Sequence, residues 1–199
     1  MTSPVKTISQ FKSALAGGGA RPTLFEVRMA TLPEGVPWDA ASDLQFLCKA
    51  AQLPASNIAQ IDVPFRGRIF KVAGDRTVEP WSITVINDEN FQIRNSMEAW
   101  IEKMAKLSNN IGNVSPDSYM VTAEVFQLAR GGNLGNSDNK AVDNGSENKI
   151  LKGYKFLDIF PTSVSAIDLS YDSSDAIEEF TVEFQVNSFE IISDAAPTP

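Results

Sequence analysis

Residues 179–186 read Glu-Phe-Thr-Val-Glu-Phe-Gln-Val, the most regular alternation of polar and apolar residues in the chain. Successive side chains of a β-strand point to opposite faces, so the four apolar residues share one face and the polar residues share the other. The apolar face holds Phe180, Val182, Phe184 and Val186. The pattern predicts a half-buried strand within an extended segment that spans residues 177–191.

The same alternation recurs upstream in Trp81-Ser82-Ile83-Thr84-Val85, which predicts a second half-buried strand. Gly67 lies near the middle of the extended segment 58–72, as expected for a hairpin or a bent strand. Further segments with strand-like composition are 24–29, 43–51, 119–128, 154–160 and 164–171, and Pro33, Gly35 and Pro37 make 32–42 a predicted loop.

Residues 91–107 carry the one long helical pattern. Phe91, Met97, Ile101 and Met104 recur at helical spacing, and Asn87-Asp88-Glu89 supplies capping residues just before them. A shorter helix is expected at 7–15, where Ile8, Phe11 and Leu15 share one face.

Many short strands with one long helix predict a mainly β protein, an antiparallel β-sandwich or barrel with one flanking α-helix. The predicted organisation is an N-terminal arm over 1–19, with a hinge at Gly17–Gly19, followed by a β domain over 20–192. Residues 131–148 are rich in Gly, Asn, Asp and Ser and predict a long flexible loop within that domain. Residues 193–199 predict a disordered tail.

Composition narrows the classes of function. The 199 residues include 25 acidic and 17 basic side chains, for a formal charge of −8. This charge opposes tight binding of nucleic acid, since affinity for DNA comes largely from Lys and Arg at the phosphates. The absence of histidine removes Ser-His-Asp and Cys-His catalysis and His-ligated zinc.

Cys48 is the single cysteine, so no internal disulfide forms, and no apolar run is long enough to cross a membrane. No secretory signal is visible in the first residues.

Two groups of polar residues invite a catalytic interpretation, and each has a structural alternative that we favour. Gly74-Asp75-Arg76 reads as a turn held by an Asp–Arg hydrogen bond rather than as an oriented catalytic carboxylate. Glu179 and Glu183 share the polar face of one strand, whereas a glycosidase pair flanks its substrate from two sides. A solvated face or the lining of an acidic channel fits these two residues better.

Three weaker candidates are also read as structural. Asp138, Asp143 and Glu147 lack the spacing of a calcium loop, and Asp172-Ser173-Ser174-Asp175 is typical of a hairpin turn. The glycines at 17–19 and 131–132 lack the context of a phosphate-binding loop and read as linkers. No cofactor and no metal are therefore expected.

Several segments together resemble the tail tube protein of contractile-tailed bacteriophages. The most specific are Ala73-Gly74-Asp75-Arg76-Thr77, Trp81 and Asn87-Asp88-Glu89, preceded by Val63-Pro64-Phe65, Arg66, Arg68, Ile69 and Val72. Ala20-Arg21-Pro22 with Leu24-Phe25, Cys48-Lys49-Ala50 with Leu53-Pro54, and Phe160-Pro161-Thr162 with Val164 and Leu169 agree in order and spacing. The resemblance covers nearly the whole chain, and the loops 131–148 and 32–42 are longer than the family pattern.

The resemblance implies a non-enzymatic virion protein that assembles in the host cytoplasm. Six subunits would close into a ring, their strands would join into one inner barrel, and rings would stack into the tail tube that conveys DNA into the host. The implied partners are copies of the chain itself, the tail sheath protein, the baseplate and tail terminator proteins, the tape-measure protein, and double-stranded DNA that passes without specific binding. No membrane partner is implied.

Within this interpretation, we expect the hairpin of 58–72 to mediate contacts between subunits and between rings, with the N-terminal arm as a second inter-ring element. The predicted contact residues are Ile61, Val63, Phe65, Arg66, Arg68, Ile69 and Phe70. Glu179 and Glu183 are the predicted lumen-facing residues, where negative charge would repel DNA phosphates.

Two alternatives remain. One is a tube protein of a type VI secretion system that carries effectors instead of DNA. The other, from a different class, is a carboxylate-dependent hydrolase that uses Glu179 and Glu183 or Asp75.

Overall fold

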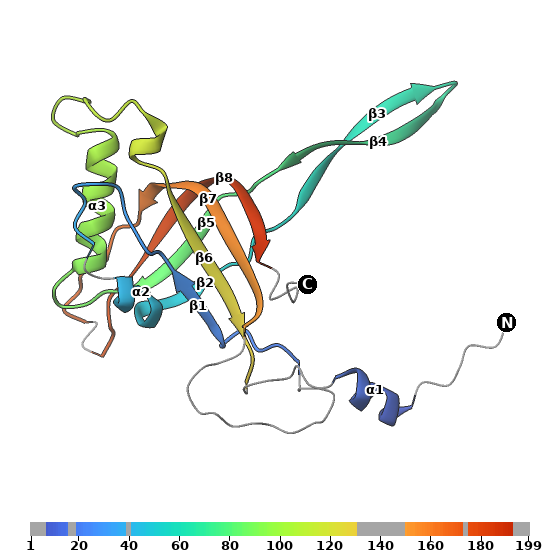
Figure 1. The fold of residues 1–199 in the computed structure, drawn as a ribbon, viewed down its shortest axis with the longest axis horizontal. Helices are drawn as coiled ribbons and strands as arrows, with labels where there is room; N and C mark the ends of the chain where they lie inside the picture. Colours follow the sequence, from blue (N-terminus) through green and yellow to red (C-terminus); the bar gives the residue numbers. More distant parts are fainter. Residues whose placement is uncertain (1–6, 16–18, 39–40, 131–149, 173–174, 193–199) are drawn as a thin grey trace, which may run out of the picture.

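The computed structural model describes residues 7–15, 19–38, 41–130, 150–172 and 175–192. Six antiparallel strands form one strongly curved sheet in the order β1-β6-β7-β8-β5-β2 (Figure 1). They are β1 Phe25–Arg28, β2 Cys48–Ala51, β5 Trp81–Ile86, β6 Val121–Leu128, β7 Ile150–Val164 and β8 Glu179–Ile192. This nearly closed antiparallel sheet confirms the mainly β fold class. Because β1 and β2 each pair with one neighbour only, they are the two edges of the sheet.

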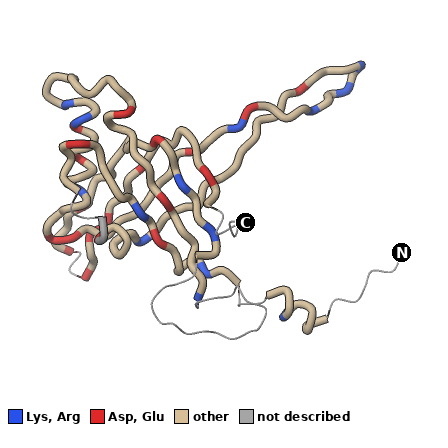
Figure 2. The backbone as a smooth tube through the Cα atoms, in the orientation of Figure 1, with Lys and Arg blue, Asp and Glu red and all other residues tan. Residues whose placement is uncertain are grey.

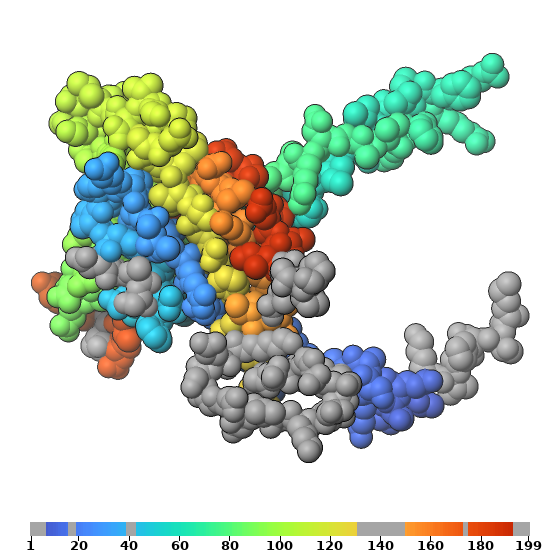
Figure 3. Space-filling model, in the orientation of Figure 1, coloured from blue at the N-terminus to red at the C-terminus, as the bar shows by residue number. Residues whose placement is uncertain are grey.

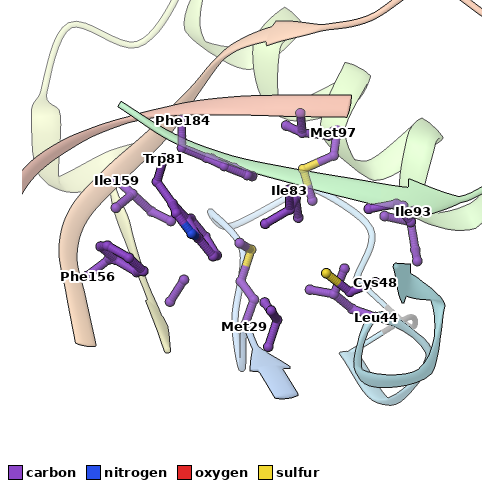
Figure 4. Close-up of a cluster of buried hydrophobic side chains, with 14 of the residues drawn as sticks. Met29, Leu44, Cys48, Trp81, Ile83, Ile93, Met97, Phe156, Ile159 and Phe184 are labelled. Atoms are coloured by element: carbon purple, nitrogen blue, oxygen red, sulfur yellow. The ribbon is translucent and has the colours of Figure 1, made fainter. Parts of the chain in front are cut away.

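Strand β8 lies inside the sheet between β7 and β5, and its alternation has the predicted orientation. The four apolar residues of its inner face are buried, while Glu179 and Glu183 are exposed on the other face. Trp81 of β5 lies beside them, with its ring 4.5 Å from Phe156 and 5.5 Å from Phe184 (Figure 4). Its indole N–H donates to the carbonyl of Gln52 at 2.9 Å, so burial of the ring leaves no unpaired donor.

The long helix is α3, Gln92–Met104, and it confirms the predicted helical segment. Its buried face holds Ile93, Met97 and Trp100, and the Trp100 N–H donates to the carbonyl of Tyr119 at 2.7 Å. The Asp88 carboxylate accepts hydrogen bonds from the amides of Asn90 and Gln92, so one of the predicted capping residues satisfies the first amide of the helix. The N-cap itself is Phe91, whose backbone is left-handed and whose side chain makes no capping bond.

Helix α1, Ile8–Ala14, also lies where it was predicted. The Thr7 hydroxyl accepts from the Gln10 amide while the Gln10 side chain accepts from the Thr7 amide, so the two residues form a capping box. A short 3₁₀ turn at Pro116–Ser118 precedes β6.

Residues 43–51 were predicted to be a strand, and this prediction is wrong for the first half. Helix α2 spans Ala41–Leu47, and β2 begins only at Cys48. Leu44 is fully buried and Leu47 packs partly against the same core, which is the i, i+3 spacing of a helix face. Helix α2 also begins inside the segment 32–42 that was predicted to be a loop.

The predicted strand at 164–171 is also wrong. Strand β7 extends through the predicted segment 154–160 and ends at Val164. The last exchange with β8 comes from Ser165, whose amide donates to the Thr181 carbonyl and whose hydroxyl accepts from the Thr181 amide, both near 2.9 Å. Beyond Ser165, no described residue of this segment pairs with a neighbouring strand, and β8 begins only at Glu179.

The segment 58–72 is a hairpin, as predicted. Strands β3, Asn57–Phe65, and β4, Arg68–Thr77, pair only with each other and project away from the body of the molecule (Figure 1). The predicted loop 131–148, the tail 193–199 and two of the three hinge glycines lie outside the described residues, as do Asp138, Asp143 and Glu147.

Candidate assembly surfaces

The tip of the β3–β4 hairpin is a two-residue turn made by Arg66 and Gly67. Their φ angles are 47° and 80°, and positive φ at both central residues is the signature of a type I′ turn, which matches the twist of paired strands. Gly67 adopts this conformation without the penalty of a Cβ atom. The Arg66 guanidinium lies 5.5 Å from the centre of the Phe65 ring, so the tip combines positive charge with an aromatic surface.

The register of the hairpin separates its side chains into two different faces. Val63 pairs with Phe70 and Ile61 pairs with Val72, and Phe65 faces Arg68 at the tip, so these residues project on one side. We call Ile61, Val63, Phe65, Phe70 and Val72 the apolar face of the hairpin. The opposite face carries Gln60, Asp62, Pro64, Ile69, Lys71 and Ala73, and Lys71 donates to Gln60 at 3.2 Å.

The apolar face has no partner within the described part of the chain. Its side chains are between 42% and 66% exposed, and every residue of β3 is exposed. A two-stranded hairpin alone is only marginally stable in water, and a contiguous exposed apolar surface marks an interaction site. The predicted contact residues Ile61, Val63, Phe65, Arg66, Arg68, Ile69 and Phe70 therefore lie together on one projecting element, although Ile69 lies on the face opposite Phe70.

Gly74, Asp75 and Arg76 were predicted to form a turn, and the structure shows that they lie within β4. The pairing shifts by one residue between Ile58–Arg76 and Gln60–Ala73, so the segment is a β-bulge. A Cβ atom on Gly74 would lie 3.0 Å from the Ala59 carbonyl oxygen, so the close approach of the two strands favours a residue without a side chain here. Arg76 bonds to Ser56 at 3.1 Å and lies 4.9 Å from the Phe189 ring, so it connects the hairpin base to β8 rather than to Asp75.

Glu179 and Glu183 lie on the outer, polar face of β8, pointing away from the core. Glu179 forms an ion pair with Lys49 of β2 at 2.5 Å, and Glu183 accepts from the Ser163 hydroxyl at 3.4 Å. Between them the hydroxyls of Thr84 and Thr181 are 3.4 Å apart. The two carboxylates thus belong to a hydrogen-bonded polar surface that spans β2, β5, β7 and β8.

Helix α1 is a second exposed apolar element, with no partner in the part of the chain that the structure describes. None of its residues is buried, and Ile8 and Phe11 are 76% and 65% exposed. Leu15, which follows the helix, continues the same stripe. An amphipathic helix with its apolar stripe in water gains little from folding alone, since most helical stability in proteins comes from packing of that stripe.

A third surface was missed from the sequence. Residues 166–172 and 175–179, here called the acidic lobe, run from the end of β7 into the start of β8. Residues 166–171 and 176–179 line an open groove of about 660 Å³. Leu169, Tyr171 and Ile177 are strongly exposed there. Residues 164–171 were interpreted as a strand, and 172–175 as a hairpin turn, so the apolar side chains were assigned to a sheet that does not extend this far. Asp172 does make a turn-like contact, as its backbone amide donates to the Ser170 hydroxyl oxygen at 3.2 Å.

Within the described residues, no group of three or more Cys, Asp or Glu side chains is arranged to hold a metal ion. The titratable group with a strongly altered pKa is Cys48, whose burial raises the thiol pKa from 9.0 to about 12. Cys48 belongs to the core next to Leu44 and not to any of the three surfaces (Figure 4). No helix in the described part of the chain is long and apolar enough to span a membrane.

A curved antiparallel body carries a long hairpin whose apolar face has no partner among the described residues, which defines a β-rich protein with an exposed interaction surface. The sequence model of the phage tail tube protein family matches residues 20–192, and the chain belongs to that family. It is therefore a structural component of the virion tail.

Individual relatives agree with this assignment. Tail tube protein gp19 of Enterobacteria phage T4 is 34% identical over 175 residues, which cover 88% of this chain and 93% of the relative. The tail tube protein of Serratia phage KSP90 is 26% identical over 192 residues, covering 94% of this chain and 97% of the relative.

Solved structures share the fold at much lower identity. A chain of the anti-feeding prophage baseplate superposes with a TM-score of 0.58 at 8% identity, covering 96% of this chain and 97% of that chain. A chain of the anti-feeding prophage tube-terminating cap gives a TM-score of 0.56 at 17% identity, covering 88% and 92%. The β architecture is thus that of proteins from contractile systems.

Proposed function

We propose that this chain polymerises as stacked hexameric rings into the inner tail tube, the conduit through which DNA is ejected into the host. The observation that carries this proposal is the β3–β4 hairpin, an amphipathic arm whose apolar face is exposed along its whole length. Such an arm is stable when its apolar face packs against another molecule. In a tube made of one protein, that molecule is a neighbouring copy.

The two edges of the sheet support closure into rings. Strands β1 and β2 each present an unpaired side, and pairing between subunits would remove these exposed edges. A contact between unlike surfaces of identical subunits generates a ring when the rotation closes and a filament when it does not. A tube needs both kinds of contact. The sixfold closure itself follows from the family resemblance.

We assign the stacking contacts to the hairpin and to the N-terminal arm, residues 1–19, with 20–192 as the tube domain. Helix α1 supports the second assignment, because its stripe of Ile8, Phe11 and Leu15 has no buried member. In the assembled tail, the sheath protein, the baseplate and tail terminator proteins and the tape-measure protein are the remaining partners. Solved structures with this fold come from a sheath/tube terminator complex and from a baseplate, which supports these partner classes.

We assign the outer polar face of β8 to the tube lumen, where the Glu179 and Glu183 carboxylates repel DNA phosphates and let the genome slide. The Lys49–Glu179 ion pair partly neutralises this face, so Glu183 is the main source of negative charge. Substitution Glu183→Lys should leave tube assembly intact and slow DNA ejection from assembled particles. Equal ejection rates for Glu183→Lys and Glu183→Gln particles would show that Glu183 does not face the lumen.

We infer that the chain has no enzymatic activity. The class of enzyme that the composition leaves open is a carboxylate-dependent hydrolase that uses Glu179 and Glu183 or Asp75. Glu179 and Glu183 lie on one outer strand face with Thr181 between them, and they are bonded to Lys49 and Ser163, respectively. A relation to phage tail tube proteins at 34% identity also favours the phage tube over a secretion tube.

Electron microscopy of the purified full chain tests the proposal. The protein, alone or seeded with baseplate complexes, should form sixfold rings and hollow tubes. A chain that stays monomeric under both conditions would overturn the proposal.

A further inference from the structure

The acidic lobe lies at the opposite end of the molecule from the tip of the hairpin. In Figure 1 the hairpin projects to the upper right, while the segment that joins β7 to β8 lies at the lower left, next to the start of α3. The space-filling view shows both features as separate projections from the same body (Figure 3). One copy therefore presents one surface at each end.

The chemistry of the acidic lobe combines negative charge with exposed apolar groups. Its residues include five carboxylates and no Lys or Arg. Two of them already have partners, as Glu178 accepts from Asn87 at 3.0 Å and Glu179 pairs with Lys49. The other three are Asp168, Asp172 and Asp175. Around them, Leu169, Tyr171 and Ile177 are 80%, 107% and 72% exposed, so large apolar side chains lie in water beside a groove with a mixed polar and apolar lining.

The outer end of the hairpin has the complementary chemistry. Residues 64–71 carry Arg66, Arg68 and Lys71 and no carboxylate, and Figure 2 shows this positive charge at the end of the arm. Phe65 and Phe70 lie beside these cations on the apolar face. Pockets that take up compact organic groups measure about 300–1,000 Å³. The groove in the acidic lobe, at about 660 Å³, is therefore large enough for these aromatic side chains.

We propose that the acidic lobe of one copy is the receptor for the hairpin of the next copy. The inference rests on the proposed stacking of rings and names the surface that receives the arm. Phe65 and Phe70 would pack against Leu169, Tyr171 and Ile177, while the arginines at the tip would pair with Asp168 and Asp172. Because donor and receptor lie at opposite ends, each contact leaves a free lobe on one copy and a free arm on the other, which propagates a stack without closing on itself.

Charge reversal in the full chain tests this pairing. Arg66→Glu with Arg68→Glu makes the tip acidic, and Asp168→Lys with Asp172→Lys places two cations at the positions that the arginines would contact. Either pair should lower the fraction of protein in tubes at least about tenfold, because like charges brought together at an interface cost several kcal/mol. The variant that carries all four substitutions should assemble again, since its charges are exchanged but complementary. Recovery by this variant also shows that the four substitutions leave the fold intact.

Cross-linking of assembled tubes gives a second measurement. Tubes of Phe65→Cys/Leu169→Cys treated with a short bis-maleimide should give a ladder of covalent oligomers. The matched Ile69→Cys/Leu169→Cys protein should give little ladder, because Ile69 lies on the opposite hairpin face. Tubes that assemble despite a reversed lobe, or that give no ladder, would overturn the receptor assignment while the tube function stands. Failure of the unmodified chain to assemble would instead overturn the tube function.

Discussion

Gly153 of β7 has a specific steric role. A Cβ atom at this position would lie 2.8 Å from two ring carbons of Phe126 and 3.1 Å from the Cβ of Ile192. Phe126 is buried, and Arg28 covers its ring at 4.9 Å, so the ring has little freedom to move. Gly153→Ala should therefore lower the free energy of unfolding by about 1–3 kcal/mol. Urea denaturation checks this value.

The control for this prediction is a double-mutant cycle with Phe126→Ala. Removal of the ring makes room for the added methyl group, so Gly153→Ala should cost much less in that background. Equal costs in the two backgrounds would show that the ring is not what excludes a side chain at this position.

Cys48 should be unreactive in the folded protein. Burial raises its thiol pKa to about 12, so at any pH below 9 the thiolate fraction is roughly a thousandfold lower than in the unfolded chain. Iodoacetamide should label Cys48 slowly at pH 8 and rapidly after urea is added. The unfolded chain loses its proton near pH 9 and the folded chain does not, so this group contributes stability that falls as the pH rises from 9 towards 12. Rapid labelling of the native protein would contradict its burial.

At the scale of elements, the two faces of the hairpin allow a matched test. Phe70 and Ile69 are neighbours with nearly equal exposure, 66% and 63%, but they project from opposite faces. Phe70→Ser should block tube assembly, because it removes a large apolar group from the face that packs against a neighbour, whereas Ile69→Ser should reduce assembly much less. Sedimentation of assembled tubes measures the difference, and equal loss in both variants would contradict the division into two faces.

Elements with a clear period were predictable from the sequence. Strand β8 alternates because one face is core and the other polar, and α3 shows the helical period because Ile93, Met97 and Trp100 face the same core. The hairpin was also predictable, since Gly67 marks its turn. These patterns depend on contacts that are local or that involve one continuous face.

The errors occurred where tertiary contacts override the local pattern. Residues 41–47 are helical because Leu44 and Leu47 pack on the sheet, although their sequence also fits a strand. Residues 165–171 have strand-forming composition but no neighbouring strand to pair with. The acidic lobe was missed for the same reason, since its apolar residues are exposed only because the ladder ends at Val164.

At the scale of the whole molecule, the surfaces are distributed so that copies can join in two directions. The sheet presents edges at β1 and β2, the hairpin extends from one end, and the acidic lobe lies at the other. Lateral pairing of edges and axial insertion of arms are separate contacts, so one can be weakened without the other. Loss of the arm contact should therefore give single rings or short stacks rather than monomers.

Cryo-electron microscopy of tubes grown from this chain would show the hairpin contact itself. The tubes should be hollow and sixfold, and each β3–β4 hairpin should lie buried against a copy in the adjacent ring. Tubes in which the hairpins remain free in solvent, or a chain that never leaves the monomeric state even with a baseplate seed, would contradict this prediction.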